Sequence, residues 1–309
     1  MIPSPGNTID FDSARLKLGR VAQPGTANTV DPVRGKTLPA LQESLNLQLQ
    51  TSLELDRILE MFFQALRDHI GLDCLEYRHE AQKIHQRIGQ LSLHRCSYRI
   101  THAGDFLGEI QFSRKRRFSE AQLLEVETLL ASLLYPLRNA LMYREAVYSA
   151  LNDSLTGIGN RMALEQAIDR EVKLAIRHRT PLSTIVLDID LFKQINDQYG
   201  HAYGDAALRA VVNCTLCCLR DVDGLFRMGG EEFVVLLGNT PASAARLVAE
   251  RIRSSIEQMQ FEIDGISIPM TASLGAATRD QDEDAKHLLD RCDKLMYAAK
   301  RAGRNRVCC

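Results

Sequence analysis

The chain has 309 residues, which predicts two domains at about 150 residues each. Lysine and arginine total 38 and aspartate and glutamate total 39, so the formal net charge of −1 favours neither nucleic acid nor a membrane surface as a partner. No apolar run approaches the ~20 residues that cross a bilayer, and no basic segment followed by an apolar one marks a secretory signal. We therefore expect a cytoplasmic protein without a membrane span, in which the eight cysteines stay reduced.

Residues 1–37 are rich in Pro, Gly, Asn, Ser and Thr without apolar periodicity, which predicts a mobile tail, and residues 38–135 are predicted to form a first domain. Its first clear helix ends at Gly71 and has apolar residues at helical spacing. These residues are Leu53, Leu55, Ile58, Leu59, Phe62, Phe63, Leu66 and Ile70. Three predicted strands and a long helix follow, with Gly104-Asp105 as a hairpin signal. The strands are expected at Asp73–Tyr77, Gln90–Ile100 and Phe106–Phe112.

This order of helix, antiparallel strands and helix resembles a GAF domain, and a PAS-like sensor is the alternative. The resemblance is carried by Gly104–Phe112 (GDFLGEIQF), by Phe118–Glu120 (FSE) and by the leucine-rich helix that begins at Ser119. It implies a sensor domain that binds an unidentified small molecule or supports dimerisation.

Residues 136–152 are predicted to be a helical linker that carries signals between the domains. Apolar residues on alternating three- and four-residue steps form a heptad seam, namely Leu123, Val126, Leu130, Leu133, Leu137, Ala140 and Val147. Arg144 weakens the seam, and Pro136 predicts a kink or a break. The seam fits packing on the first domain's own core as well as pairing with a second subunit. We expect the early part to do the first and the later part the second.

The second domain, predicted over residues 153–309, contains an apolar, β-branched run that ends in two carboxylates. The run is Leu182–Asp190 (LSTIVLDID), and it predicts a buried strand. Asp188 and Asp190 are two residues apart, so they are expected to share one face at the strand's end.

A second acidic site follows between two short apolar runs in residues 225–237. Gly229 and Gly230 predict a tight β-hairpin, because glycine at both central positions supplies the positive φ angles of a two-residue turn and leaves room for a ligand's phosphates. Glu231 and Glu232 come next and are expected to have different roles, since adjacent strand residues point to opposite faces. Carboxylates at two neighbouring strand ends can hold divalent metal ions. The alternative is a plain hairpin with solvated acids.

Residues 153–309 resemble the GGDEF domain of diguanylate cyclases. The matching segments are Asp153–Arg161 (DSLTGIGNR), Asp188–Asp197 (DIDLFKQIND), Gly229–Phe233 (GGEEF), Tyr297–Lys300 (YAAK) and Gly303–Asn305 (GRN). The resemblance implies condensation of two GTP molecules into cyclic di-GMP with release of pyrophosphate, and Mg²⁺ or Mn²⁺ as cofactor. Each GTP must attack the other's α-phosphate, so we expect a homodimer with facing sites. The fold class expected for the chain is α/β (α+β), with a GAF-like antiparallel sheet and helices, a helical linker and a palm-like cyclase domain.

The same resemblance implies roles for the acidic residues. Asp188, the main-chain carbonyl of Ile189 and Glu231 are expected to hold the metal. Glu232 is expected either to be a further metal ligand or to help deprotonate the 3′-hydroxyl. Asn160 is expected to cap the helix that follows the first motif.

Further residues resemble the family's substrate contacts. Lys193, Lys300 and Arg304 correspond to phosphate contacts, and Lys193 is counted with the catalytic group. Asn196 and Asp205 correspond to the guanine-reading pair. Their chemistry suits guanine rather than adenine, because a carboxylate accepts both N1–H and N2–H₂.

Arg220 and Asp223 form an R-x-x-D pattern just before the Gly-Gly pair and resemble the family's inhibitory site for its own product. Arg251 is expected to add a contact from the next helix. The alternative for these charges is pairing at a helix end.

Two other functions stay open from the sequence. One is a catalytically silent module that binds GTP or cyclic di-GMP and signals by protein contact. The other is a different nucleotide cyclase or polymerase-like palm.

Overall fold

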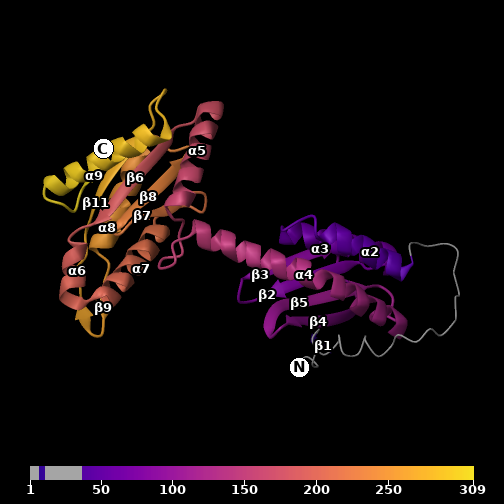
Figure 1. Cartoon of the computed structure of the whole chain (residues 1–309). Helices are drawn as coiled ribbons and strands as arrows, with labels where there is room; N and C mark the ends of the chain where they lie inside the picture. The colour runs from indigo at the N-terminus through magenta and orange to yellow at the C-terminus, as the bar shows by residue number, and fades with distance from the viewer. Residues whose placement is uncertain (1–6, 11–36) are drawn as a thin grey trace. The chain divides into compact units, whose positions relative to one another are not determined.

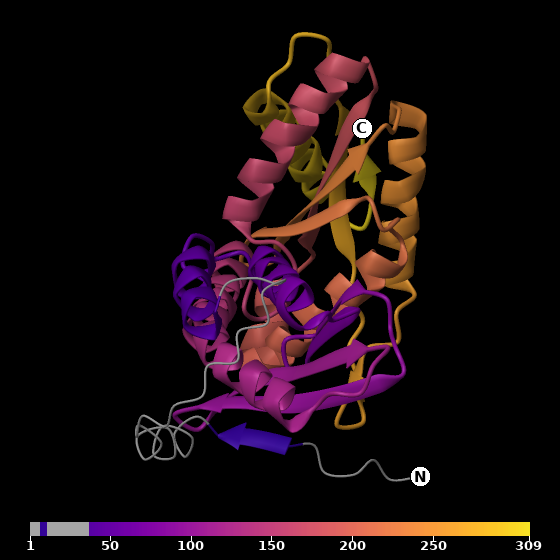
Figure 2. The ribbon, with the colours of Figure 1, turned by 90° about the vertical axis from the view of Figure 1, so that its right-hand side faces the viewer.

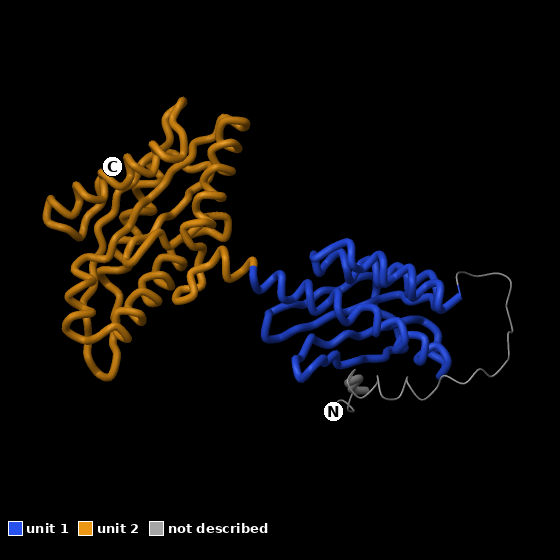
Figure 3. The backbone as a smooth tube through the Cα atoms, in the orientation of Figure 1, with its two compact units in different colours: residues 1–146 blue, residues 147–309 orange. Residues whose placement is uncertain are grey.

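A computed structural model of the chain describes residues 7–10 and 37–309 (Figure 1). The chain divides into two compact units, residues 1–146 and 147–309 (Figure 3). The predicted mobile tail falls for the most part outside the described residues. Within it, Asn7–Asp10 form strand β1, because their backbone pairs in parallel with Tyr98–Thr101. Within the described ranges, none of the helices has the length and apolar character that a membrane span needs.

The first unit is built on a five-stranded sheet in the order β1-β4-β5-β2-β3. Its remaining elements are α2 (Leu38–Leu49), α3 (Leu55–Ile70), β2 (Cys74–His79), β3 (Ile84–Gly89), β4 (His94–His102), β5 (Asp105–Arg114) and α4 (Glu120–Leu151). Buried residues of α2, α3 and α4 form one core with the sheet, around Phe62, Tyr77 and Phe112. The expected order of helix, antiparallel strands and helix is therefore confirmed, and Gly71 ends α3 in the left-handed conformation.

Two predictions for this unit were wrong in detail. The strand expected at Gln90–Ile100 begins only at His94, and β3 was not predicted. β3 lies at the edge of the sheet and alternates exposed polar residues such as His85 and Arg87 with few apolar ones, so its apolar signal is weak.

Helix α4 is not broken at Pro136, which lies inside the helix and is buried. The seam residues Val126, Leu130, Leu133 and Leu137 are at most 1 % exposed, so the early part of the helix packs on the first unit's core. This packing offsets the one backbone hydrogen bond that proline cannot make. From Met142 to Ala150 every side chain is exposed.

The second unit is a five-stranded sheet in the order β12-β11-β6-β8-β7, with helices on both faces. Its elements are α5 (Arg161–His178), β6 (Leu182–Ile189), α6 (Phe192–Tyr199), α7 (His201–Cys217), β7 (Gly224–Gly229), β8 (Glu232–Gly238), α8 (Ala242–Glu257), β9 (Glu262–Ile263), β10 (Ile266–Ser267), β11 (Ala272–Thr278), α9 (Ala285–Arg301) and β12 (Val307–Cys308). Helices α5 and α9 pack on one face, and α6, α7 and α8 pack on the other. Figure 2 shows α5 and α8 on opposite sides of the sheet. Central β6 is buried along its whole length between antiparallel β8 and β11. The mixed α/β fold class is therefore confirmed.

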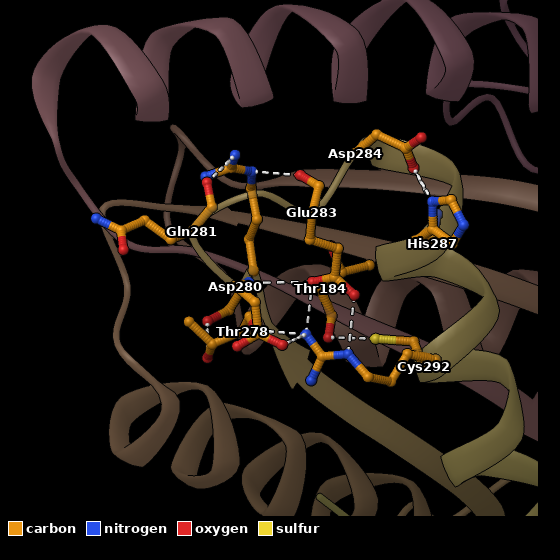
Figure 4. Close-up of polar contacts among 11 residues, drawn as sticks. Thr184, Thr278, Asp280, Gln281, Glu283, Asp284, His287 and Cys292 are labelled. Carbon is orange, nitrogen blue, oxygen red and sulfur yellow. Dashed lines mark hydrogen bonds and ion pairs between the residues drawn. The ribbon is translucent and has the colours of Figure 1, made fainter.

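The start of α9 is fixed to the sheet by polar contacts (Figure 4). Asp284 caps the helix by accepting a hydrogen bond from the backbone N–H of His287 at 2.8 Å. Arg291 pairs with Glu283 at 2.6 Å and donates to the carbonyl of Thr278 at 2.6 Å. These contacts set the direction in which α9 runs across the sheet toward Lys300.

Farther along, α9 lies directly against β11 at Gly275. A Cβ atom on Gly275 would collide with the main-chain carbonyl of Cys292 and the main-chain nitrogen of Met296. Glycine is needed here for space, because no side chain can move aside to relieve a clash with backbone atoms.

We predict that Gly275→Ala lowers the free energy of unfolding of the second unit by about 1–3 kcal/mol, because the clash forces α9 away from the sheet. Gly238→Ala is the matched control, since its Cβ would meet only the flexible carboxylate of Glu171, and its effect should stay within about 0.5 kcal/mol. Urea unfolding of both variants gives the comparison. Equal stabilities would contradict the close packing of α9.

Candidate active site

The hairpin between β7 and β8 differs from the prediction by one residue. Gly229 pairs with Glu232, so the two-residue turn is Gly230-Glu231 rather than Gly229-Gly230. Of the two glycines, only Gly230 has a positive φ, +27°. The reason is an irregularity in the β7–β8 pairing at Met228, which shifts the register between the strands. Glu231 therefore lies in the turn, and Glu232 begins β8.

The strand register brings the predicted acidic residues to one end of the sheet. Asp188 of β6 is the cross-strand partner of Glu232, so their side chains share a face. The backbone N–H of Ile189 donates to the carbonyl of Glu231 at 3.3 Å. Asp188, Ile189, Glu231 and Glu232 thus meet where β6 ends and the hairpin turns.

Lys300, in the last turn of α9, supplies a positive charge to this cluster. Its Nζ lies 2.6 Å from Oδ2 of Asp188, whose side chain is only 4 % exposed. The other oxygen, Oδ1, is buried and has no hydrogen-bond partner among the described residues. Burial raises the pKa of Asp188 to about 6, and the charges of Glu231 and Glu232 add to this, whereas Lys300 opposes it. Burial also raises the pKa of Glu231, again against the effect of Lys300.

These residues fit a hard divalent cation that is bound together with phosphate oxygens. In the part of the chain that the structure describes, no three His, Cys, Asp or Glu side chains gather as a metal site on their own. Mg²⁺ needs only one or two carboxylates when substrate phosphates complete its shell. The buried and unpaired Oδ1 of Asp188 is the kind of atom that such a cation would satisfy.

Asp190 has a different role from Asp188, although the sequence pairs them. Its carboxylate accepts hydrogen bonds from the Thr271 hydroxyl at 2.8 Å, the Ser273 hydroxyl at 2.6 Å and the Asn305 backbone N–H at 3.0 Å. Asp190 therefore holds the loop after α9, where Arg304 and Asn305 both adopt positive φ angles.

The predicted guanine-reading pair lies across the junction of α6 and α7. Asn196 is half-buried on α6, and Asp205 is exposed on the first turns of α7. A Cβ on Gly204 would collide with Oδ1 of Asn196 and approach the ring of Phe192. The absence of a side chain at Gly204 therefore lets the Asn196 amide lie against α7, at the residue before Asp205 in the sequence.

The other predicted phosphate contacts are on the surface. Lys193 is exposed in the first turn of α6, and Arg304 is exposed in the loop that Asp190 holds. Neither belongs to the buried cluster as Lys300 does.

The R-x-x-D residues form a compact turn between α7 and β7. Asp223 Oδ2 accepts from the Arg220 backbone N–H at 2.9 Å, and the Asp223 N–H donates to the Arg220 carbonyl at 3.0 Å. Arg251 on α8 donates to the Cys218 carbonyl at 2.5 Å. Arg220 and Arg251 line one hollow of about 460 Å³ together with aliphatic residues such as Leu247.

Sequence reasoning missed Arg227, which holds the acidic turn from the β7 side. Its guanidinium pairs with Asp153 at 2.9 Å and donates to the carbonyl of Gly230 at 2.6 and 3.0 Å. Burial alone would raise the pKa of Asp153, but hydrogen bonds from Thr156 and Arg227 hold it below its ordinary value. Spacing along the chain gave no signal for this role, because Asp153 lies 74 residues before Arg227. Asn160 caps α5 as predicted, by accepting from the Ala163 N–H at 3.1 Å.

Residues 150–306 match the family model described as diguanylate cyclase, GGDEF domain. The chain is 35% identical over 262 residues to diguanylate cyclase DgcS of Shewanella oneidensis, which covers 84% of this chain and 85% of that protein. Because this alignment is longer than the second unit, the similarity reaches into the first. Diguanylate cyclase A of Treponema denticola is 50% identical over 127 residues, which cover 41% of this chain but only 34% of that protein.

A solved structure shares the fold of the second unit. It is the coiled coil and GGDEF domain of DgcB from Caulobacter crescentus in complex with c-di-GMP, with a TM-score of 0.54 and 29% identity. The match covers 61% of this chain and 97% of that one.

We predict that Arg227→Met lowers the free energy of unfolding by about 1–3 kcal/mol, because Asp153 and the Gly230 carbonyl both lose a charged partner. Amide hydrogen exchange at Gly230 and Glu231 should also become faster. The control is Arg161→Met, which removes an exposed pair with Glu165 and should cost less than about 1 kcal/mol. If the two variants behave alike in unfolding and exchange, Arg227 does not hold the turn.

Proposed function

The chain belongs to the GGDEF family of diguanylate cyclases, and from this premise we propose that its second unit condenses two GTP molecules into cyclic di-GMP and two pyrophosphates with Mg²⁺ or Mn²⁺. The observation that carries this proposal is the meeting of Asp188, Glu231 and Glu232 at one end of the sheet, with Lys300 as counter-ion. A buried carboxylate with an unpaired oxygen beside two further acids is costly to maintain without a function.

In this proposal Asp188, the carbonyl of Ile189 and Glu231 hold the divalent cation. The cation, when bound, offsets the negative charge of the triphosphate and polarises its phosphoryl oxygens. Glu232 is either a further ligand or the base that accepts the proton of the 3′-hydroxyl. The β6–β8 register supports both roles, since it sets Glu232 opposite Asp188.

Asn196 and Asp205 select guanine. The Asp205 carboxylate accepts hydrogen bonds from N1–H and N2–H₂, and the Asn196 amide can donate to or accept from the base. Adenine presents a different edge, so ATP is a poor substrate. Gly229 and Gly230 leave the hairpin open to the phosphates, and both are exposed. Lys193, Lys300 and Arg304 bind phosphate oxygens.

The enzyme acts as a homodimer. One site holds one GTP, and each 3′-hydroxyl must reach the α-phosphate of the other nucleotide, which a two-fold dimer provides. The later part of α4 supports dimerisation, because its exposed face carries Met142, Tyr143, Val147 and Tyr148.

The first domain, over residues 38–135, is a GAF-like sensor for a small molecule, and residues 136–152 pass its state to the cyclase domain, residues 153–309. The continuity of α4 from the first core to Leu151 supports this role. We place the protein in the cytoplasm, where GTP is available.

Product feedback is part of the proposal. Arg220 and Arg251 face one hollow, which can accept the phosphates or guanine edges of cyclic di-GMP. Asp223 uses one carboxylate oxygen to close its own turn, so the other remains for a guanine.

We predict that Glu231→Gln lowers the rate of cyclic di-GMP formation by roughly 10²-fold or more, because the metal loses a charged ligand. The test measures pyrophosphate and cyclic di-GMP after incubation with GTP and Mg²⁺, and ATP in place of GTP should yield neither. Glu165→Gln, at an exposed position of α5, is the control with unchanged activity. Full activity in Glu231→Gln would refute the metal assignment. A wild-type protein that binds GTP without releasing pyrophosphate would instead be a silent binding module.

We predict that Arg220→Ala raises the cyclic di-GMP concentration needed for half inhibition by roughly tenfold or more, because a charge-assisted contact is lost. Arg246→Ala, at an exposed position of α8, should leave inhibition unchanged. Inhibition curves with added product separate the variants. Identical curves for Arg220→Ala and wild type would show that Arg220 does not bind the inhibitory cyclic di-GMP.

A further inference from the structure

Lys300 forms an ion pair with Asp188, which is also a proposed ligand of the metal. Its ammonium lies 2.6 Å from Asp188 Oδ2, and its side chain is 28 % exposed whereas that of Asp188 is 4 % exposed. The only oxygen of Asp188 left without a partner among the described residues is Oδ1. In this arrangement Lys300 pairs with one carboxylate oxygen of Asp188 and leaves the other without a partner.

A divalent cation at Asp188 and Lys300 in its present position are in conflict. Two like charges a few ångströms apart in a partly buried site repel each other strongly, because water screens them poorly there. A metal ion that enters alone must displace the ammonium, and the ammonium then needs another anionic partner. Lys300 is free to move, since a lysine has a flexible four-carbon stem and this one ends at the partly exposed edge of the site.

A nucleotide triphosphate provides that partner. Its oxygens can receive the Lys300 ammonium at the moment when the metal takes Asp188. The triphosphate draws Lys300 away from Asp188 and so favours metal binding. The metal, by taking Asp188, releases Lys300 to bind the triphosphate.

We propose that Lys300 is an exchangeable counter-ion that couples metal binding to nucleotide binding: it occupies Asp188 in the nucleotide-free protein and transfers to the triphosphate when the metal and the nucleotide enter together. This inference rests on the proposed function, in which the same site binds metal and GTP. The coupling is reciprocal, so GTP raises metal affinity by the factor by which metal raises GTP affinity. The lysine thereby disfavours metal binding in the absence of nucleotide.

The test measures Mn²⁺ binding to the full chain by calorimetry, with and without 3′-deoxy-GTP, which lacks the attacking hydroxyl. In the wild type the nucleotide should tighten Mn²⁺ binding by a factor in the range of about 5 to 150. In Lys300→Met, Mn²⁺ binding without nucleotide should tighten by about fivefold or more, and the coupling factor should fall.

Two further variants complete the design. Arg301→Met removes a neighbouring positive charge from the same exposed helix end and should leave Mn²⁺ affinity within about twofold of wild type. Lys300→Arg retains the charge and should keep nucleotide-free Mn²⁺ binding weak, which distinguishes charge competition from a general disturbance of the fold.

If Lys300→Met binds Mn²⁺ without nucleotide no more tightly than the wild type, while the wild type still binds metal and 3′-deoxy-GTP together, the counter-ion role is wrong and the proposed function stands. If the wild type binds neither Mn²⁺ nor 3′-deoxy-GTP, the proposed function fails and the counter-ion role fails with it.

Discussion

The burial of Asp188 beside two further carboxylates at the end of β6 is the constraint on which the acidic site depends. Burial raises the pKa of Asp188, and the charges of Glu231 and Glu232 raise it further. Lys300 opposes this effect, and it reaches Asp188 because α9 crosses the sheet in close contact at Gly275. The packing of α9 on the sheet therefore also determines how the negative charge of the site is balanced.

The β7–β8 hairpin supplies the other two carboxylates, and its backbone must be held so that they stay near Asp188. The irregular pairing at Met228 moves the turn forward by one residue, so Glu231 lies in the loop rather than in a strand. The backbone there is held at two points: Arg227 binds the carbonyl of Gly230, and the N–H of Ile189 binds the carbonyl of Glu231. An acidic side chain on a turn can keep its position only if the backbone beneath it is fixed in this way, because the charges around it favour separation.

Local pattern predicted much of this architecture. Apolar periodicity and glycine signals located α3, the start of α4 and central β6 to within a few residues. The register of β6 and β8 brings the two acidic motifs to one end of the sheet. The pairing shift in the hairpin was missed because a Gly-Gly pair does not reveal which residues pair across the turn. The roles of Asp190 and Arg227 were missed because their partners are distant, with Asn305 115 residues after Asp190 and Asp153 74 residues before Arg227. Such contacts arise from topology, which spacing along the chain does not encode.

Arg227 also connects the residues just after α4 to the acidic turn. α4 ends at Leu151, and Asp153 follows it almost at once, so the Asp153–Arg227 pair stands between the end of the helix and the carbonyl of Gly230. The side chains of both partners are largely shielded from water, at 15 % and 21 % exposure, so their interaction is stronger than a surface ion pair. A change in the position of the helix end must therefore either strain this pair or move the turn with it.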